Sequence, residues 1–221
     1  MNRMFAAIAR RYDLMNRLMT GGRDRAWRQY VIRLAQLPPG GWLLDVATGT
    51  GEIGYEALRQ VPDAHVVGVD FTHEMILIGQ QKRHRGTIQF VEGNACRLPF
   101  ADDAFDVVTS GFAMRNVADI HTAFAEQRRV AKPGGRVICL ETTPPPHGLW
   151  GAIYRLYFFH LVPIVGGLLT GRRDAYAYLP RSTERFPSPE ALKAIMEAVG
   201  LRHVRYRPLT LGTVVVHMGI K

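Results

Sequence analysis

The stretch LDVATGTGEIG, from Leu44 to Gly54, joins a short apolar run to three glycines in a Gly-x-Gly-x-x-Gly spacing. The apolar residues predict a buried strand, and the residues after Gly51 predict a helix. Glycine at such a turn allows positive φ and lets backbone amides approach a nucleotide-like ligand. The stretch therefore predicts the first strand, turn and helix of an α/β fold with a ligand at the turn.

Short apolar runs alternate with helical segments after this unit, which predicts a parallel sheet flanked by helices. Two extended stretches end the chain, at 202–209 and 213–220, and their short link favours an antiparallel hairpin. The pattern predicts an α/β, Rossmann-like doubly wound sheet of seven strands with the last antiparallel, similar to class I methyltransferases. We expect the earlier strands at 42–47, 65–70, 87–93, 105–111 and 136–141, and helices at 51–61, 72–84, 118–131 and 189–199.

Length and composition favour one domain. The 221 residues are 47% hydrophobic, enough for a substantial core, and the two cysteines have no metal spacing, so we expect no metal and a cytoplasmic protein. We expect a single domain over 1–221, with a helical, basic preface at 1–36 and an apolar helical lid insert at 144–186. The insert carries Arg155, His160 and Pro163 within its most apolar part, which argues against a membrane span.

The acidic residue inside the first strand separates two classes of cofactor. Dehydrogenases bring a negatively charged pyrophosphate to the glycine turn, and Asp45 would repel it. A carboxylate at that position suits a cationic amino-acid end, as in S-adenosylmethionine. Asp70, at the end of the second strand, can accept hydrogen bonds from ribose hydroxyls in either class. Asn94, after the third strand, can read an adenine edge through its amide, or it can be a turn asparagine. We expect Gly54 to serve helix–strand packing.

Longer motifs resemble one family over nearly the whole chain. YDLMNRLMTGGRDRAW (Tyr12–Trp27) and RVAKPGGRVICLET (Arg129–Thr142) resemble the two signatures of the menaquinone/ubiquinone biosynthesis C-methyltransferases, and MRNV (Met114–Val117) is similar to their arginine–asparagine motif. The resemblance implies an S-adenosylmethionine-dependent C-methyltransferase that acts on a reduced prenylated quinol, demethylmenaquinol first. Together with the residue argument it gives a set of cofactor contacts: Asp45, Gly49, Thr50, Gly51, Asp70, Asn94, Ala95 and Gly111, with Ser110 as the alternative to Gly111.

Several positions depart from the family pattern. Asp24 stands where the first signature commonly has histidine, Thr143 where the second ends in serine, and Ala47 where many relatives have glycine. These departures leave the cofactor assignment unchanged, but they put the identity of the quinone in doubt. A ubiquinone precursor, or another small phenolic ring, is the alternative substrate.

The resemblance also suggests residues for the reaction. Arg115 can stabilise a developing phenolate and Asn116 can fix a quinol oxygen, although a helix-entry turn with a surface arginine is the plainer interpretation. His160 and Tyr154 of the insert can relay a proton, although a lone histidine in an apolar segment is more often a packed core residue. Tyr12 and Asn16, on one face of the first helix, can line the mouth of the substrate site or merely pack that helix.

The insert and the net charge raise the question of partners. Apolar residues recur at helical spacing from Leu149 to Leu161, which fits either core packing or a groove for a prenyl tail. The net charge of +9 fits peripheral contact with anionic lipid on the inner face of the membrane. An RNA-binding methyltransferase is a more distant alternative, but aromatic-interleaved basic patches are not visible, so we expect no nucleic acid. A homodimer stays open.

Overall fold

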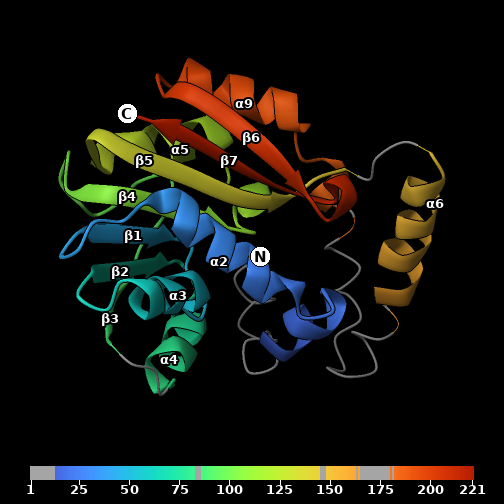
Figure 1. Cartoon of the computed structure of the whole chain (residues 1–221), viewed down its shortest axis with the longest axis horizontal. Coiled ribbons are helices and arrows are strands. Elements are labelled where there is room, and N and C mark those ends of the chain that lie inside the picture. The colour runs from blue at the N-terminus through green and yellow to red at the C-terminus, as the bar shows by residue number, and fades with distance from the viewer. Residues whose placement is uncertain (1–12, 83–85, 145–147, 163, 165–179, 181) are drawn as a thin grey trace.

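The computed structural model describes residues 13–82, 86–144, 148–162, 164, 180 and 182–221. A seven-stranded sheet forms its centre, in the order β3-β2-β1-β4-β5-β7-β6 (Figure 1). The first five strands pair in parallel, and β7 pairs antiparallel with both β5 and β6. The strands are β1 (Trp42–Val46), β2 (His65–Asp70), β3 (Ile88–Glu92), β4 (Phe105–Gly111), β5 (Ala131–Thr142), β6 (Arg202–Leu209) and β7 (Val214–Ile220).

Helices cover both faces of the sheet, and successive strand residues point to opposite faces. Leu43 belongs to the core beneath α2 and α3, whereas the neighbouring Leu44 belongs to the core beneath α5 and α9. The layered α/β architecture predicted from the sequence is confirmed. The helical elements are α2 (Arg23–Ala35), α3 (Glu52–Gln60), α4 (His73–Gln81), η1 (Met114–Asn116), α5 (Ile120–Val130), α6 (Leu149–Leu156), the π-helical η2 (Tyr157–Leu161), α9 (Pro189–Ala198) and η3 (Thr210–Gly212).

Strand β5 is longer than its apolar run. The sequence predicts a strand from Arg136 to Glu141 after a KPGG loop, whereas β5 begins at Ala131. Ala131 pairs with Phe105, and the register then shifts across the intervening residues before pairing resumes at Arg136. The backbone of the glycine pair also hydrogen-bonds with Lys221, because Gly134 donates to its carbonyl oxygen and Gly135 accepts from its amide. The end of the chain thus extends the sheet into a segment that reads locally as a turn.

Local signals placed the helix ends with mixed success. Ser188 caps α9 as predicted, since its side chain accepts from the amide of Ala191 at 3.2 Å. Helix α4 ends at Gln81, earlier than the predicted end near 84, because Lys82 adopts extended backbone angles. Among the described residues no helix is both long and apolar enough to cross a membrane. Outside the sheet, α6 stands to one side of the molecule (Figure 1).

Candidate active site

The carboxyl ends of the parallel strands gather the polar residues that the sequence singles out. Parallel α/β sheets bind their ligands at this edge, where the strand order reverses. Here the reversal lies between β1 and β4. Asp70 ends β2, Gly111 ends β4, and Glu141 lies next to the end of β5. The topology therefore brings these residues, which are distant in sequence, to one edge of the sheet.

The glycine loop between β1 and α3 depends on positive φ angles. Gly49 and Gly51 have φ of 57° and 83°, and Ala47 adopts 53°, in a region that favours glycine. A Cβ on Gly51 would lie 2.9 Å from the ring of Phe90. A Cβ on Gly54 would lie 2.8 Å from Ile88, so the packing role expected for Gly54 is confirmed.

Asp45 is almost completely buried beneath this loop, with 1% of its surface exposed. Its two carboxyl oxygens accept from Thr48 at 2.7 Å and from Thr109 at 2.9 Å. Burial raises the pKa of Asp45 to about 6, and the nearby Asp70 acts in the same direction. A cation near this carboxylate would stabilise its ionised form, which fits the charge argument made from the sequence.

Asp70 organises the loop from the neighbouring strand. One carboxyl oxygen accepts from the amide of Gly49 at 2.7 Å, and the other accepts from the amide of Thr72 at 2.8 Å. Burial raises the pKa of Asp70 above its ordinary value. The carboxylate therefore fixes the start of the glycine loop, while its contact with a ribose stays a prediction.

The segment after β3 satisfies part of the prediction for Asn94. Its Oδ1 accepts from the amide of Cys96 at 2.9 Å, as in a turn asparagine. Asn94 is exposed, and Ala95 packs against the hydrophobic core. The turn geometry and an adenine contact through Nδ2 are compatible.

Ser110 and Gly111, the two alternative cofactor contacts at the end of β4, differ in exposure. Ser110 is 1% exposed and lies inside the sheet, whereas Gly111 is half-buried at its edge. A Cβ on Gly111 would lie 2.5 Å from Cδ1 of Ile53, so the Ile53 side chain would have to move to make room for it. Of these two residues, Gly111 is the better placed to contact a ligand.

A buried ion pair follows directly after Gly111. Arg115, in η1, pairs through Nη1 with Oε1 of Glu141 on β5, and their side chains are 6% and 1% exposed. Phe112, which follows Gly111 directly, has a φ of 56°, unusual for a bulky residue. Arg115 therefore lies in the interior and is not the surface arginine of the plainer interpretation. Sequence reasoning missed Glu141, although a glutamate inside an apolar strand was a signal for it.

The insert brings Tyr154 to this ion pair. Burial raises the pKa of the Tyr154 phenol, whereas Arg115 and a hydrogen bond with Thr213 lower it. The ring of Tyr154 stacks on Phe158, with centroids 5.2 Å apart. The hydroxyl of Tyr157 donates to the carbonyl oxygen of Met19 at 2.7 Å, which joins the insert to the helical residues 13–19.

The other residues suggested for the reaction have fewer contacts with the Arg115–Glu141 pair. Asn116 lies next to Arg115 in η1, and its Nδ2 donates to the carbonyl oxygen of Phe112 at 3.5 Å. His160 is exposed, and no hydrogen bond among the described residues joins it to Arg115 or Tyr154. Asn16 is half-buried in the helical residues 13–19. Tyr12 lies outside the described residues.

The hydroxyl of Thr50 lies within a charged cluster. It donates to Asp13 at 2.8 Å and accepts from Lys82 at 2.8 Å. Lys82 also pairs with Asp13 at 2.7 Å and with Glu52 at 2.5 Å. The glycine loop is therefore tied to the N-terminal helical residues.

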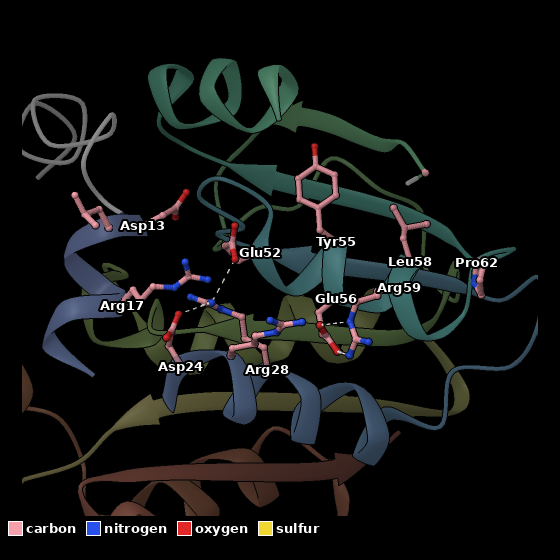
Figure 2. Close-up of a pocket in the computed structure, with 13 residues that line it drawn as sticks. Asp13, Arg17, Asp24, Arg28, Glu52, Tyr55, Glu56, Leu58, Arg59 and Pro62 are labelled. Atoms are coloured by element: carbon pink, nitrogen blue, oxygen red, sulfur yellow. Dashed lines mark hydrogen bonds and ion pairs between the residues drawn. The ribbon is translucent and has the colours of Figure 1, made fainter. Parts of the chain in front are cut away.

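A cavity of about 870 Å³ lies between these N-terminal residues and α3 (Figure 2). It contains four arginines and four acidic side chains, several of which neutralise each other. Arg28 pairs with Asp24 at 2.7 Å, and Arg59 pairs with Glu56 at 2.5 Å. Asp45, Asp70 and Gly111 do not line this cavity, so it is distinct from the edge where the predicted cofactor residues gather.

The insert also presents an apolar surface outward. Tyr154 and Phe158 face the protein, and Phe158 is buried. Large aliphatic residues at helical spacing are instead exposed, so the core-packing interpretation of this stripe is wrong for them. They are Leu149, Ile153, Leu156 and Leu161.

Comparison with solved structures supports the fold. A methyltransferase from Aquifex aeolicus, described as SAM dependent, superposes with a TM-score of 0.67 at 17% identity, covering 94% of this chain and 97% of that one. A phosphoethanolamine N-methyltransferase from Haemonchus contortus in complex with S-adenosyl-L-methionine has a TM-score of 0.66 at 14% identity, covering 89% and 52%. The class I methyltransferase fold predicted from the sequence is confirmed.

Sequence relatives give the family. A demethylmenaquinone methyltransferase from Thermus thermophilus is 47% identical over 218 residues, which cover 98% of this chain and 99% of the relative. The ubiquinone/menaquinone biosynthesis C-methyltransferase UbiE of Desulfotalea psychrophila is 41% identical over 222 residues, covering 99% and 89%.

The model of the ubiE/COQ5 methyltransferase family matches residues 1–221. The predicted resemblance and the enzyme class are confirmed, and the methyl donor predicted with them is S-adenosylmethionine. This chain belongs to the ubiE/COQ5 methyltransferase family.

Proposed function

We propose that this protein transfers the methyl group of S-adenosylmethionine to a ring carbon of a reduced prenylated quinol, with demethylmenaquinol as the substrate and menaquinol as the product. The buried Arg115–Glu141 pair supports this proposal, because it supplies a buried cation close in sequence to the carboxyl ends of β4 and β5 and in electrostatic contact with Tyr154 of the insert. Four relatives that are 44–47% identical to this chain are named demethylmenaquinone methyltransferases, which favours a naphthoquinol over a ubiquinone precursor.

We assign cofactor binding to the glycine loop and the neighbouring carboxyl ends of the parallel strands. The residues that would hold S-adenosylmethionine fit its charges, since Asp45 and Asp70 face a sulfonium and an ammonium group better than a pyrophosphate. When bound, the cofactor supplies an electrophilic methyl group. The proposed contacts are Asp45, Gly49, Thr50, Gly51, Asp70, Asn94, Ala95 and Gly111, with Ser110 behind them.

The quinol must donate electron density from its ring. As its hydroxyl releases a proton to solvent, negative charge develops on the oxygen, and the guanidinium of Arg115 would stabilise that charge. Asn116 would fix the oxygen by hydrogen bonding. Holding the ring carbon against the methyl donor supplies much of the rate by itself. Once the new carbon–carbon bond has formed, the ring carbon releases its proton to solvent and the electron pair of that C–H bond restores the aromatic ring.

The exposed apolar face of the insert is the proposed contact surface for the prenyl tail. Leu149 is 80% exposed and Leu156 is 65% exposed, values that are high for leucine. We propose that this face meets the membrane surface where a prenylated quinol resides, with the net charge of +9 favouring anionic lipid.

An assay with purified protein tests the proposal. The protein is given S-adenosylmethionine with demethylmenaquinol, kept reduced and dispersed in anionic liposomes, and the products are separated by chromatography and mass spectrometry. We expect a methylated naphthoquinol from the reduced substrate and no product from the oxidised quinone. Methylation of a soluble phenol with no reaction of demethylmenaquinol would instead identify another small-molecule methyltransferase.

A further inference from the structure

Glu141 is the carboxylate whose role the proposed reaction leaves open. It lies near the carboxyl end of β5 and is 1% exposed. Its Oε1 accepts from the amide and the hydroxyl of Thr142, at 2.8 and 3.2 Å, and also from Nη1 of Arg115. The amide of Arg115 approaches Oε2 at 3.4 Å. The carboxylate is thus fixed to its own strand on one side and to η1 on the other.

The guanidinium of Arg115 has a hydrogen-bond partner at Nη1 but none at Nε among the described residues. Its Nη1 binds Glu141, but its Nε is buried and has no hydrogen-bond partner among the described residues. Buried donors are almost always paired, so an unpaired one indicates a missing ligand or a functional role. Among the described residues of the insert, Tyr154 interacts electrostatically with this guanidinium. The Nε–H is therefore the donor of Arg115 that we assign to the quinol oxygen.

From these contacts, and resting on the proposed function, we infer that Glu141 is a positioning residue for Arg115. Its negative charge balances the buried guanidinium, so a neutral quinol can enter without leaving an isolated cation in the interior. Its attachment to Thr142 holds the carboxylate that binds Nη1 of the guanidinium, which leaves the Nε–H for the oxygen on which negative charge develops. Glu141 acts through Arg115 and does not itself take part in methyl transfer.

A double-mutant cycle in kcat tests this role. The variants are Glu141→Gln, Arg115→Gln and the double variant, assayed with demethylmenaquinol and radiolabelled S-adenosylmethionine. We expect Glu141→Gln to lower kcat about 100-fold, as for a misplaced catalytic group. The KM for S-adenosylmethionine and its affinity by calorimetry stay unchanged, because none of the proposed cofactor contacts is substituted. In the Arg115→Gln background, Glu141→Gln lowers kcat no further, since the group it positions is gone.

Two additional variants separate positioning from folding. Glu141→Asp keeps the charge and recovers part of the lost kcat. The double variant removes both charges and therefore folds even where Glu141→Gln alone leaves a buried cation unpaired. Asp106→Asn serves as the control, because Asp106 pairs with Lys132 at 2.8 Å on the same strand pair and has no place in the site. Its kcat should match that of the unmodified protein.

The outcomes distinguish this inference from the proposed function. Unchanged kcat in Glu141→Gln, or an equal loss with and without Arg115, overturns the positioning role while the methyltransferase activity stands. If the unmodified protein binds S-adenosylmethionine but does not methylate the quinol, the proposed function is refuted and the inference fails with it.

Discussion

Replacing Asp45 with asparagine should make the protein more stable at neutral pH and weaken its binding of cofactor. Asp45 is fully enclosed, and burial raises its pKa from 3.8 to about 6. Above pH 6 the folded protein holds an ionised carboxylate in the interior, which the unfolded chain holds in water. The difference between these two pKa values lowers the free energy of unfolding at neutral pH by about 3 kcal/mol, since a shift of one pKa unit corresponds to about 1.36 kcal/mol.

The raised pKa of Asp45 determines how stability changes with pH. A carboxyl group whose pKa is raised in the folded state contributes most stability below pH 3.8, and that contribution is lost as the pH rises through 6. Asparagine has no such charge, and its amide can still hydrogen-bond with Thr48 and Thr109. The free energy of unfolding of Asp45→Asn should therefore exceed that of the unmodified protein by about 3 kcal/mol at pH 7.5. The two values should be equal near pH 3.5.

Thermal and chemical unfolding between pH 3.5 and 7.5 provide the measurement. For a chain of this size, 3 kcal/mol corresponds to a rise in Tm of roughly 6–12 °C at neutral pH. Calorimetry with S-adenosylmethionine should show at least about tenfold weaker binding, the loss of about 1.4 kcal/mol. As the control, Asp106→Asn should lower stability at neutral pH, because Lys132 holds the pKa of Asp106 below its ordinary value. A stability difference for Asp45→Asn that is absent or independent of pH would refute the reasoning.

Three further predictions concern stability. Ala47→Gly should raise the free energy of unfolding by about 0.5–1 kcal/mol, because the residue has a φ of 53° that glycine adopts without strain, and urea unfolding measures it. Burial lowers the pKa of His217 to about 4, so stability should fall as the pH drops from 6.5 to 4, by about 3 kcal/mol in total. His217→Gln should flatten this acid limb, and an unchanged limb would show that another group causes it. Ser188→Ala should lower Tm by about 2–4 °C through loss of the α9 cap, and no change would mean that the 3.2 Å hydrogen bond does not contribute.

Much of the fold was predictable because its signals are local. The strand from Phe105 to Gly111 and the hairpin of β6 and β7 follow from runs of apolar residues and short turns, and they lie where the sequence placed them. The helix cap at Ser188 and the packing role of Gly54 also follow from nearest neighbours. Segments that depend on distant partners were placed less well, as the start of β5 shows.

The amino-acid sequence alone determined the family, the glycine loop and the charge that favours a cationic cofactor, since each depends on residue types at short spacing. Only the tertiary structure decided which of these residues act on each other. Asp45 has a raised pKa because neighbouring strands enclose it, and Thr109, 64 positions away, donates to it. The pairing of Arg115 with Glu141 joins residues 26 positions apart. Burial and non-local pairing arise only when the sheet assembles, and for that reason no local pattern revealed Glu141.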